Sequence, residues 1–142
     1  MNNPYATPVL RGLGGEVAPG DRYVYVPRIH QIGFSLAGNE FLRDRASEFT
    51  DEGDFLWRAV SFPSYTGSFR IQFTDANGYT LSNTLIDYTA FVNPSGSRVP
   101  FPIFPEVVFP KSSKISISIQ DTSGAANNII VVLWGVLRGK LR

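Results

Sequence analysis

Few side chains in this sequence could act together at a reactive centre. Cysteine is absent, which excludes a thiol nucleophile, a disulfide framework and a cysteine-based zinc or iron–sulfur site. His30 is the one histidine, so a histidine-rich metal site is excluded and a Ser-His-Asp arrangement would depend on this residue. The Gly-x-Ser-x-Gly elbow of hydrolases does not occur. We expect His30, which lies between Ile29 and Gln31, to be a surface or hydrogen-bonded structural histidine.

A second group of reactive side chains comes directly before a strand-like segment and consists of Asp51, Glu52 and Asp54. Two acids that flank a cleft can cleave glycosides, and carboxylate oxygens bind calcium. However, adjacent acids before a strand are typical of a solvated turn, and the spaced Asp-x-Asn-x-Asp-Gly loop is absent. Alternatively, the three acids form an acidic face that contacts another subunit.

Three tyrosines, Tyr65, Tyr79 and Tyr88, lie in or near predicted loops. Exposed aromatic rings of β-sandwich binding modules stack on sugars, so these tyrosines are candidates for glycan binding, and packing at strand ends is the alternative. Nucleic acid is not an expected partner, because the net charge is +1 and a nucleic-acid interface needs basic and aromatic residues on one face. The arginines are scattered instead, at Arg28, Arg58, Arg70 and Arg98.

The elements that would position these residues are strands. The 142 residues include 11 Phe, 13 Gly and 10 Pro, the composition of one domain of short strands joined by turns. Apolar and polar residues alternate, or apolar runs occur, in several segments. These predicted strands are 23–26, 29–36, 54–62, 69–73, 86–92, 107–109, 115–119 and 129–137, with a hairpin turn at Asn77-Gly78. One short helix is predicted within 39–50, with Asn39 as its cap.

About eight strands without βαβ alternation favour an all-β fold, an antiparallel β-sandwich of the jelly-roll kind. A fibronectin-like sandwich is the alternative, because the sequence does not determine strand order. The apolar strand 54–62 is expected at the centre of a sheet. The apolar strand 129–137 is expected to be buried on both faces, either at the centre of a sheet or in part at an oligomer interface. The predicted core consists of Phe55, Trp57, Phe69, Ile71, Phe73, Ile115, Ile117, Ile119, Val131 and Leu133.

A proline-rich segment, 99–110, cannot be a central strand, because each of its four prolines lacks an N–H donor. We predict an edge strand or an extended crossover that covers the sandwich. Its phenylalanines either cover the core or, as in the case of Phe101 and Phe104, project as anchors into a neighbouring subunit.

The predicted domain, 21–137, has an extended arm at 1–20 and a basic tail at 138–142. We expect the arm to add contacts through Pro4, Tyr5 and Arg11. The tail carries Arg138, Lys140 and Arg142 and is predicted to dock on an acidic surface. No targeting segment is evident, and the longest apolar run, 129–137, is shorter than the roughly 20 residues of a membrane span; no membrane partner is expected.

The second half of the chain resembles a family of phage structural proteins. The segments that carry the resemblance are 54–60 (DFLWRAV), 67–73 (GSFRIQF), Gly78-Tyr79, 101–107 (FPIFPEV), 115–121 and 128–140. Over about residues 54–140 they resemble the cement or decoration proteins encoded beside capsid genes in tailed bacteriophages. The resemblance implies a jelly-roll subunit without cofactor or enzymatic activity. It also implies a homodimer or homotrimer that binds the major capsid protein on the outer surface of the virion head after assembly in the host cytoplasm.

Two other classes of function remain open. A β-sandwich module of a phage tail or receptor-binding apparatus would bind a surface glycan through the tyrosines. A small glycosidase would depend on Asp51 or Asp54.

Overall fold

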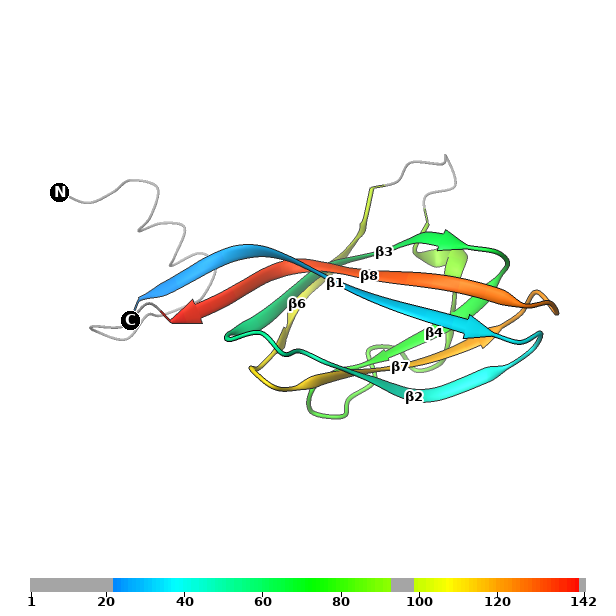
Figure 1. Cartoon of the computed structure of the whole chain (residues 1–142), viewed down its shortest axis with the longest axis horizontal. Helices are drawn as coiled ribbons and strands as arrows, with labels where there is room; N and C mark the ends of the chain where they lie inside the picture. Colours follow the sequence, from blue (N-terminus) through cyan, green and yellow to red (C-terminus); the bar gives the residue numbers. More distant parts are fainter. Residues whose placement is uncertain (1–21, 93–98, 141–142) are drawn as a thin grey trace.

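The structure is a computed structural model that describes residues 22–92 and 99–140. Its eight strands form two four-stranded antiparallel sheets that pack face to face (Figure 1). The first sheet has the order β1-β8-β3-β6 and the second has the order β2-β7-β4-β5. The elements are β1 (Tyr23–Leu36), β2 (Phe41–Glu48), β3 (Asp54–Tyr65), β4 (Phe69–Thr74), β5 (Ile86–Asp87), the 3-10 helix η1 (Tyr88–Ala90), β6 (Phe101–Phe109), β7 (Lys114–Asp121) and β8 (Asn127–Lys140).

The strand pairing is nested. β1 pairs with β8, β2 with β7, β3 with β6 and β4 with β5, which is the winding of a jelly roll. The prediction of an antiparallel β-sandwich of about eight strands is confirmed, and the strand order distinguishes the jelly roll from the fibronectin-like alternative. β3 and β8 are central strands and β6 is an edge strand, also as predicted.

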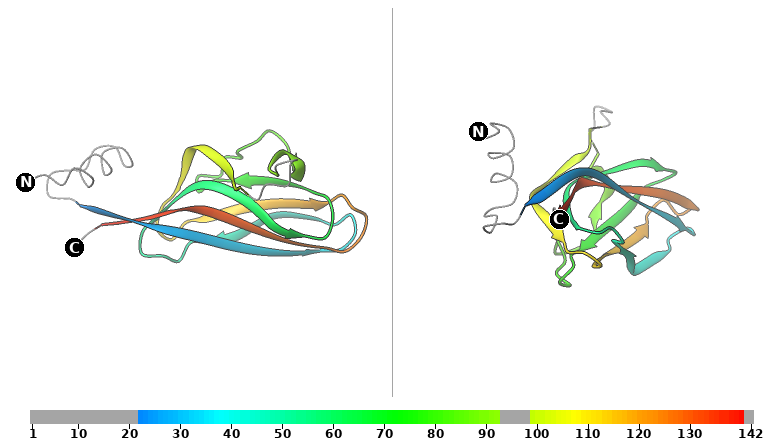
Figure 2. Two further views of the ribbon diagram at one scale, coloured as in Figure 1. Left: turned by 90° about the horizontal axis from the view of Figure 1, so that it is seen from above. Right: turned by 60° about the vertical axis from the view of Figure 1, so that its left-hand side comes forward.

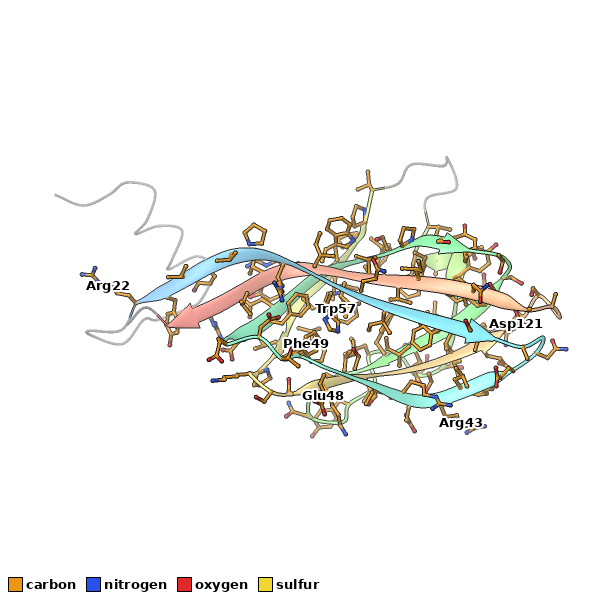
Figure 3. The ribbon with its side chains drawn as sticks, in the orientation of Figure 1. Arg22, Arg43, Glu48, Phe49, Trp57 and Asp121 are labelled. Carbon is orange, nitrogen blue, oxygen red and sulfur yellow. The ribbon has the colours of Figure 1, made fainter. Side chains whose placement is uncertain are left out.

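The core fills the space between the two sheets, where Phe49 and Trp57 point inward (Figure 3). Every residue of the predicted core is at most 4% exposed. Aromatic rings dominate its centre: the Trp57 and Phe73 rings lie 5.0 Å apart, and Phe49 contacts both Phe55 and Phe109. This packing makes the sandwich a rigid support for side chains that project from it.

The predicted short helix within 39–50 is wrong: the segment is a turn followed by β2. Asn39 has a φ of 62° and lies in a turn closed by a hydrogen bond from the Glu40 N–H to the Ala37 carbonyl, so it caps no helix. A bulge between Leu42 and Arg45, where Asp44 has a φ of 49°, shifts the alternation of β2. The shifted phase mimics helical spacing, and pairing with β7 overrides it.

Two other predicted boundaries also differ from the structure. Pro27 does not interrupt β1, because β1 is an edge strand and Pro27 pairs in register with Val136. The predicted strand at 86–92 stops after β5, because the Asp87 side chain accepts a hydrogen bond from the Thr89 N–H and begins η1.

β1 and β8 are the longest strands, with 14 residues each. β1 and β8 continue together past the start of β3, where Asp54 pairs with Arg138, and the blue and red ribbons show their ends beyond the other strands (Figures 1 and 2). β8 ends at Lys140, so the first three residues of the predicted tail belong to this strand. Below, this two-stranded extension is called the β1/β8 arm.

Candidate assembly surface

The acidic turn is neutralised by basic residues of the same chain. Asp51 pairs with Arg28, Glu52 with Lys111 at 3.1 Å, and Asp54 with Arg138 at 3.1 Å. These three basic residues lie on or next to β1, β6 and β8, so the carboxylates tie the turn to its surroundings. In the described part of the chain, no three residues of the His, Asp and Glu types are grouped to hold a metal ion.

The predicted basic tail is only partly described. Arg138 is held inside the sheet, where its guanidinium also lies over the Tyr23 ring at 5.6 Å. Lys140 ends β8. The candidate contacts Pro4, Tyr5, Arg11 and Arg142 lie outside the described residues, and docking of the tail on an acidic surface stays a prediction.

His30 is half-buried on the core-facing side of β1. Its Nε2 lies 2.9 Å from the Ser47 hydroxyl, and its ring lies 4.6 Å from the Phe49 ring. Burial lowers the pKa of His30; Asp51 raises it and Arg28 lowers it to smaller extents. Of the two placements predicted for His30, at the surface or in a hydrogen bond, the structure shows the hydrogen-bonded one.

Among the described residues, Asp121 has the most strongly shifted pKa, and the sequence patterns did not point to it. It ends β7 (Figure 3) and is 1% exposed. It accepts hydrogen bonds from the Asn39 N–H (2.8 Å), the Ser123 hydroxyl (2.7 Å), the Gly124 N–H (2.9 Å) and the Asn127 amide (3.0 Å). These bonds, the Ser123 bond above all, hold the pKa of Asp121 far below its ordinary value, although burial opposes them. Its donors belong to adjoining loops and to Asn127, the first residue of β8, so Asp121 joins the loops to this strand.

The tyrosines do not form one platform. Tyr65 and Tyr88 lie together, with ring centroids 5.1 Å apart, and both pack on the buried Phe69. Tyr79 is 71% exposed in the turn after β4, and no ring contact of the described residues joins it to the other two. The packing alternative therefore describes Tyr65 and Tyr88 well.

β6 contains an outward hump. Val107 pairs with Trp57, and Pro102 pairs with Ala59, so the four residues 103–106 face Arg58 alone. Four residues opposite one must leave the plane of the sheet, and the Arg58 Nε–Glu106 ion pair at 2.8 Å holds the base of the hump. Phe104, at the hump, is 95% exposed, more than any other large apolar side chain described.

A cavity of about 720 Å³ adjoins the hump at the open side of the sandwich. The buried residues Trp57, Ile71 and Phe73 line its deep part, and Leu81, Ile86 and Phe91 face the hump residues across it. Phe101 is 40% exposed and packs edge-on against Phe91, with ring centroids 5.3 Å apart. Of the two predicted anchors, Phe104 projects and Phe101 partly joins the core.

Other exposed apolar side chains lie on the β1/β8 arm and next to it: Val24, Val26, Ile29 and Trp134. Val24, Val26 and Ile29 are not among the contacts predicted from the sequence, whereas Trp134 belongs to 129–137, for which a partial oligomer interface is one of the two expectations. The alternation of Val24 and Val26 with Tyr23 and Tyr25 was the available signal for an exposed row.

Comparisons with protein-family models, with curated proteins and with solved structures found no match to this chain. Among the described residues, no helix is long and apolar enough to cross a membrane.

Proposed function

We propose that this chain is a non-enzymatic virion structural protein, a decoration subunit that binds the outside of a phage head and stabilises contacts between capsomers. One observation carries the proposal: a rigid jelly roll presents Phe104 with 95% of its surface exposed, on a hump beside an apolar cavity. Exposed aromatic side chains on rigid supports are the usual anchors of protein interfaces.

Burial of the Phe104 side chain by a partner would contribute to the free energy of binding. Complete burial of a phenylalanine side chain contributes roughly 1.5–3 kcal/mol. The hump is braced by the Arg58–Glu106 ion pair and by β3, so little conformational entropy is lost when a partner covers it. An exposed ring on a strand segment that is braced in this way favours binding to another protein.

Two further features support this class of function. Jelly rolls are common among viral capsid proteins and lectins, although a fold does not determine a function. The resemblance of residues 54–140 to decoration proteins favours the capsid over the glycan, and the packing of Tyr65 and Tyr88 on Phe69 weakens the case for sugar stacking.

The test compares virus heads made with and without this chain. We expect density for the chain on the outer surface of the heads and earlier thermal rupture of heads that lack it. Adding purified chain back should restore both. Density at the tail, or binding to a glycan array that Tyr79→Ser abolishes, would favour the receptor-binding alternative and contradict the proposal.

A single substitution tests whether Phe104 makes the contact with the head. Phe104→Ser should weaken binding to heads by at least about tenfold, because an exposed anchor is lost without loss of core packing. Val26→Ser is the control, since it removes another exposed apolar side chain from β1, at the opposite edge of the first sheet from β6. Equal binding of the Phe104→Ser variant and the wild type would exclude the hump as the contact.

A further inference from the structure

The outer face of the first sheet, which points away from the core, carries two complete rows of apolar residues. The registers of β1 with β8, β8 with β3 and β3 with β6 define each row across all four strands. The first row is Pro27, Val136, Leu56 and Val108, and the second is Ile29, Trp134, Ala59 and Pro102. We call these eight residues the outer patch.

Burial separates the outer patch from the core. Trp57, Val60 and Leu133 belong to the core cluster between the sheets, and their neighbours along the strands point the opposite way. Leu56 is 0% exposed, yet it is not part of that cluster. The apolar side chains on the outer face of the first sheet therefore form a layer that is separate from the core between the two sheets.

This layer is accessible in the described structure. Ile29 is 54% exposed, Val108 is 41% exposed and Trp134 is 37% exposed. The Trp134 indole N–H donates a hydrogen bond of 2.8 Å to the Ser61 hydroxyl, which satisfies its polar atom and holds the ring. A fixed ring with no unmet donor is suited to burial against another surface.

Polar residues border the outer patch on both sides. The next row toward the chain ends contains Tyr25, Arg138 and Asp54, in which Arg138 and Asp54 form an ion pair. The next row in the other direction contains Gln31 and Ser61 on either side of the buried Val132. An apolar centre with a polar rim is the anatomy of a protein interface.

We propose that the outer patch packs against the outer patch of a second copy of this chain, in a two-fold symmetric dimer. At about 4.8 Å between strands and 3.4 Å per residue, the patch covers roughly 270 Å² in projection, about a third of the 800 Å² that each partner buries in a standard interface. The rim supplies the remainder. The sheet face is shaped to pack on a like sheet about 10 Å away.

Charge favours a second copy over a charged partner. The basic and acidic groups of the rim, Arg138 and Asp54, are paired with each other within the chain. Two identical faces can therefore meet without repulsion between unpaired like charges, whereas a strongly acidic or basic partner would find no complementary charge. This inference deepens the proposed function, on which its biological meaning rests, by naming the self-association surface.

The experiment uses the isolated full chain, so it is independent of capsid binding. Sedimentation of the wild type over a concentration series should give twice the 15.7 kDa mass of the chain. Ile29→Asp should weaken the dimer on the order of 30-fold or more, because it buries a charge at the apolar centre. Val26→Asp is the matched control: Val26 is 48% exposed on the same strand but lies on the opposite face.

Tryptophan fluorescence provides a second readout. Trp57 is 0% exposed, so an aqueous quencher reports on Trp134. The wild-type dimer should resist quenching, the Ile29→Asp variant should be quenched, and the unquenched emission of Trp57 should show that the variant is folded. An unchanged mass of the Ile29→Asp variant would overturn the proposal. So would a wild-type monomer, whether its Trp134 is quenched or is protected by residues 1–21 of its own chain.

Discussion

Asp121 shows how a buried carboxylate can be structural. A strongly shifted pKa in a protein often marks a catalytic group, but every donor to Asp121 comes from the loops at one end of the sandwich or from Asn127, the first residue of β8. One oxygen accepts from Ser123 and Asn127, and the other accepts from the Asn39 and Gly124 N–H groups. Both oxygens are thus required as acceptors.

We expect Asp121→Asn to lower the free energy of unfolding near pH 7, because an amide NH₂ would face two donors in place of an oxygen. The pKa is lower in the folded chain than the roughly 3.9 of an unfolded aspartate. The ionised group therefore stabilises the fold above about pH 4, and this contribution is lost as the pH falls further. Urea denaturation at several pH values should show the difference between the two proteins narrowing toward acid. Glu48→Gln, at an exposed position, should show neither effect.

Residue by residue, the sequence predicts burial better than it predicts polar networks. The core positions followed from alternation, which needs only the neighbours along the strand. The partners of Asp121 span residues 39–127, so they become visible only once the loops have been brought together.

Gly135 limits how β8 and β3 can pack. A Cβ added at Gly135 would lie 2.0 Å from the Leu56 carbonyl oxygen, next to the bulge between Trp57 and Ala59. The backbone of a central strand cannot move away without breaking its ladder on the other side. The glycine in this apolar strand is therefore a packing requirement.

Gly135→Ala should lower the free energy of unfolding by about 3 kcal/mol or more, because the clash is with backbone. Gly33→Ala is the matched control in the same sheet: nothing lies within 4 Å of its Cβ position, and the change should be neutral or stabilise by up to about 1 kcal/mol. Thermal unfolding of both variants checks this. Similar losses in both would mean that strand propensity, and not the close approach, controls the effect.

The errors in assigning elements have local physical causes. The bulge at Asp44 made a strand resemble a helix, and Pro27 was read as a break although an edge strand tolerates it. Bulges and edge positions are defined by how a strand pairs with its neighbours, which the local sequence does not show. By contrast, 115–119 alternates without interruption and was assigned correctly as part of β7.

The nested pairing brings together strands from opposite ends of the chain. Tyr23 pairs with Lys140 and Leu36 with Asn127, so β1 cannot complete its ladder until β8 has been placed. Contacts of such large sequence separation slow folding, because the loops between them must close first. We expect refolding in milliseconds to seconds, followed by Trp57 fluorescence in stopped-flow mixing. Microsecond folding would contradict this expectation.

The outer patch illustrates what remains hidden before the strands are ordered. Its eight residues come from four segments between Pro27 and Val136, and each looks unremarkable alone. The projecting Phe104 was predictable, because prolines on both sides exclude it from a regular central strand. By contrast, a row of residues that crosses a sheet can be identified only once the register of its strands is known.

The β1/β8 arm also determines how the molecule responds to pulling. Because Tyr23 lies opposite Lys140 at its tip, opposed forces on these two ends act across the strands and along the ladder hydrogen bonds. Such a load concentrates on the outermost pair and opens the arm one pair at a time, like a zipper. A tension transmitted along the strands would instead shear many hydrogen bonds at once. The tip of the β1/β8 arm is therefore the mechanically weakest point of the molecule. If tethers attached to these two ends were pulled apart, the arm would open before the sandwich unfolds.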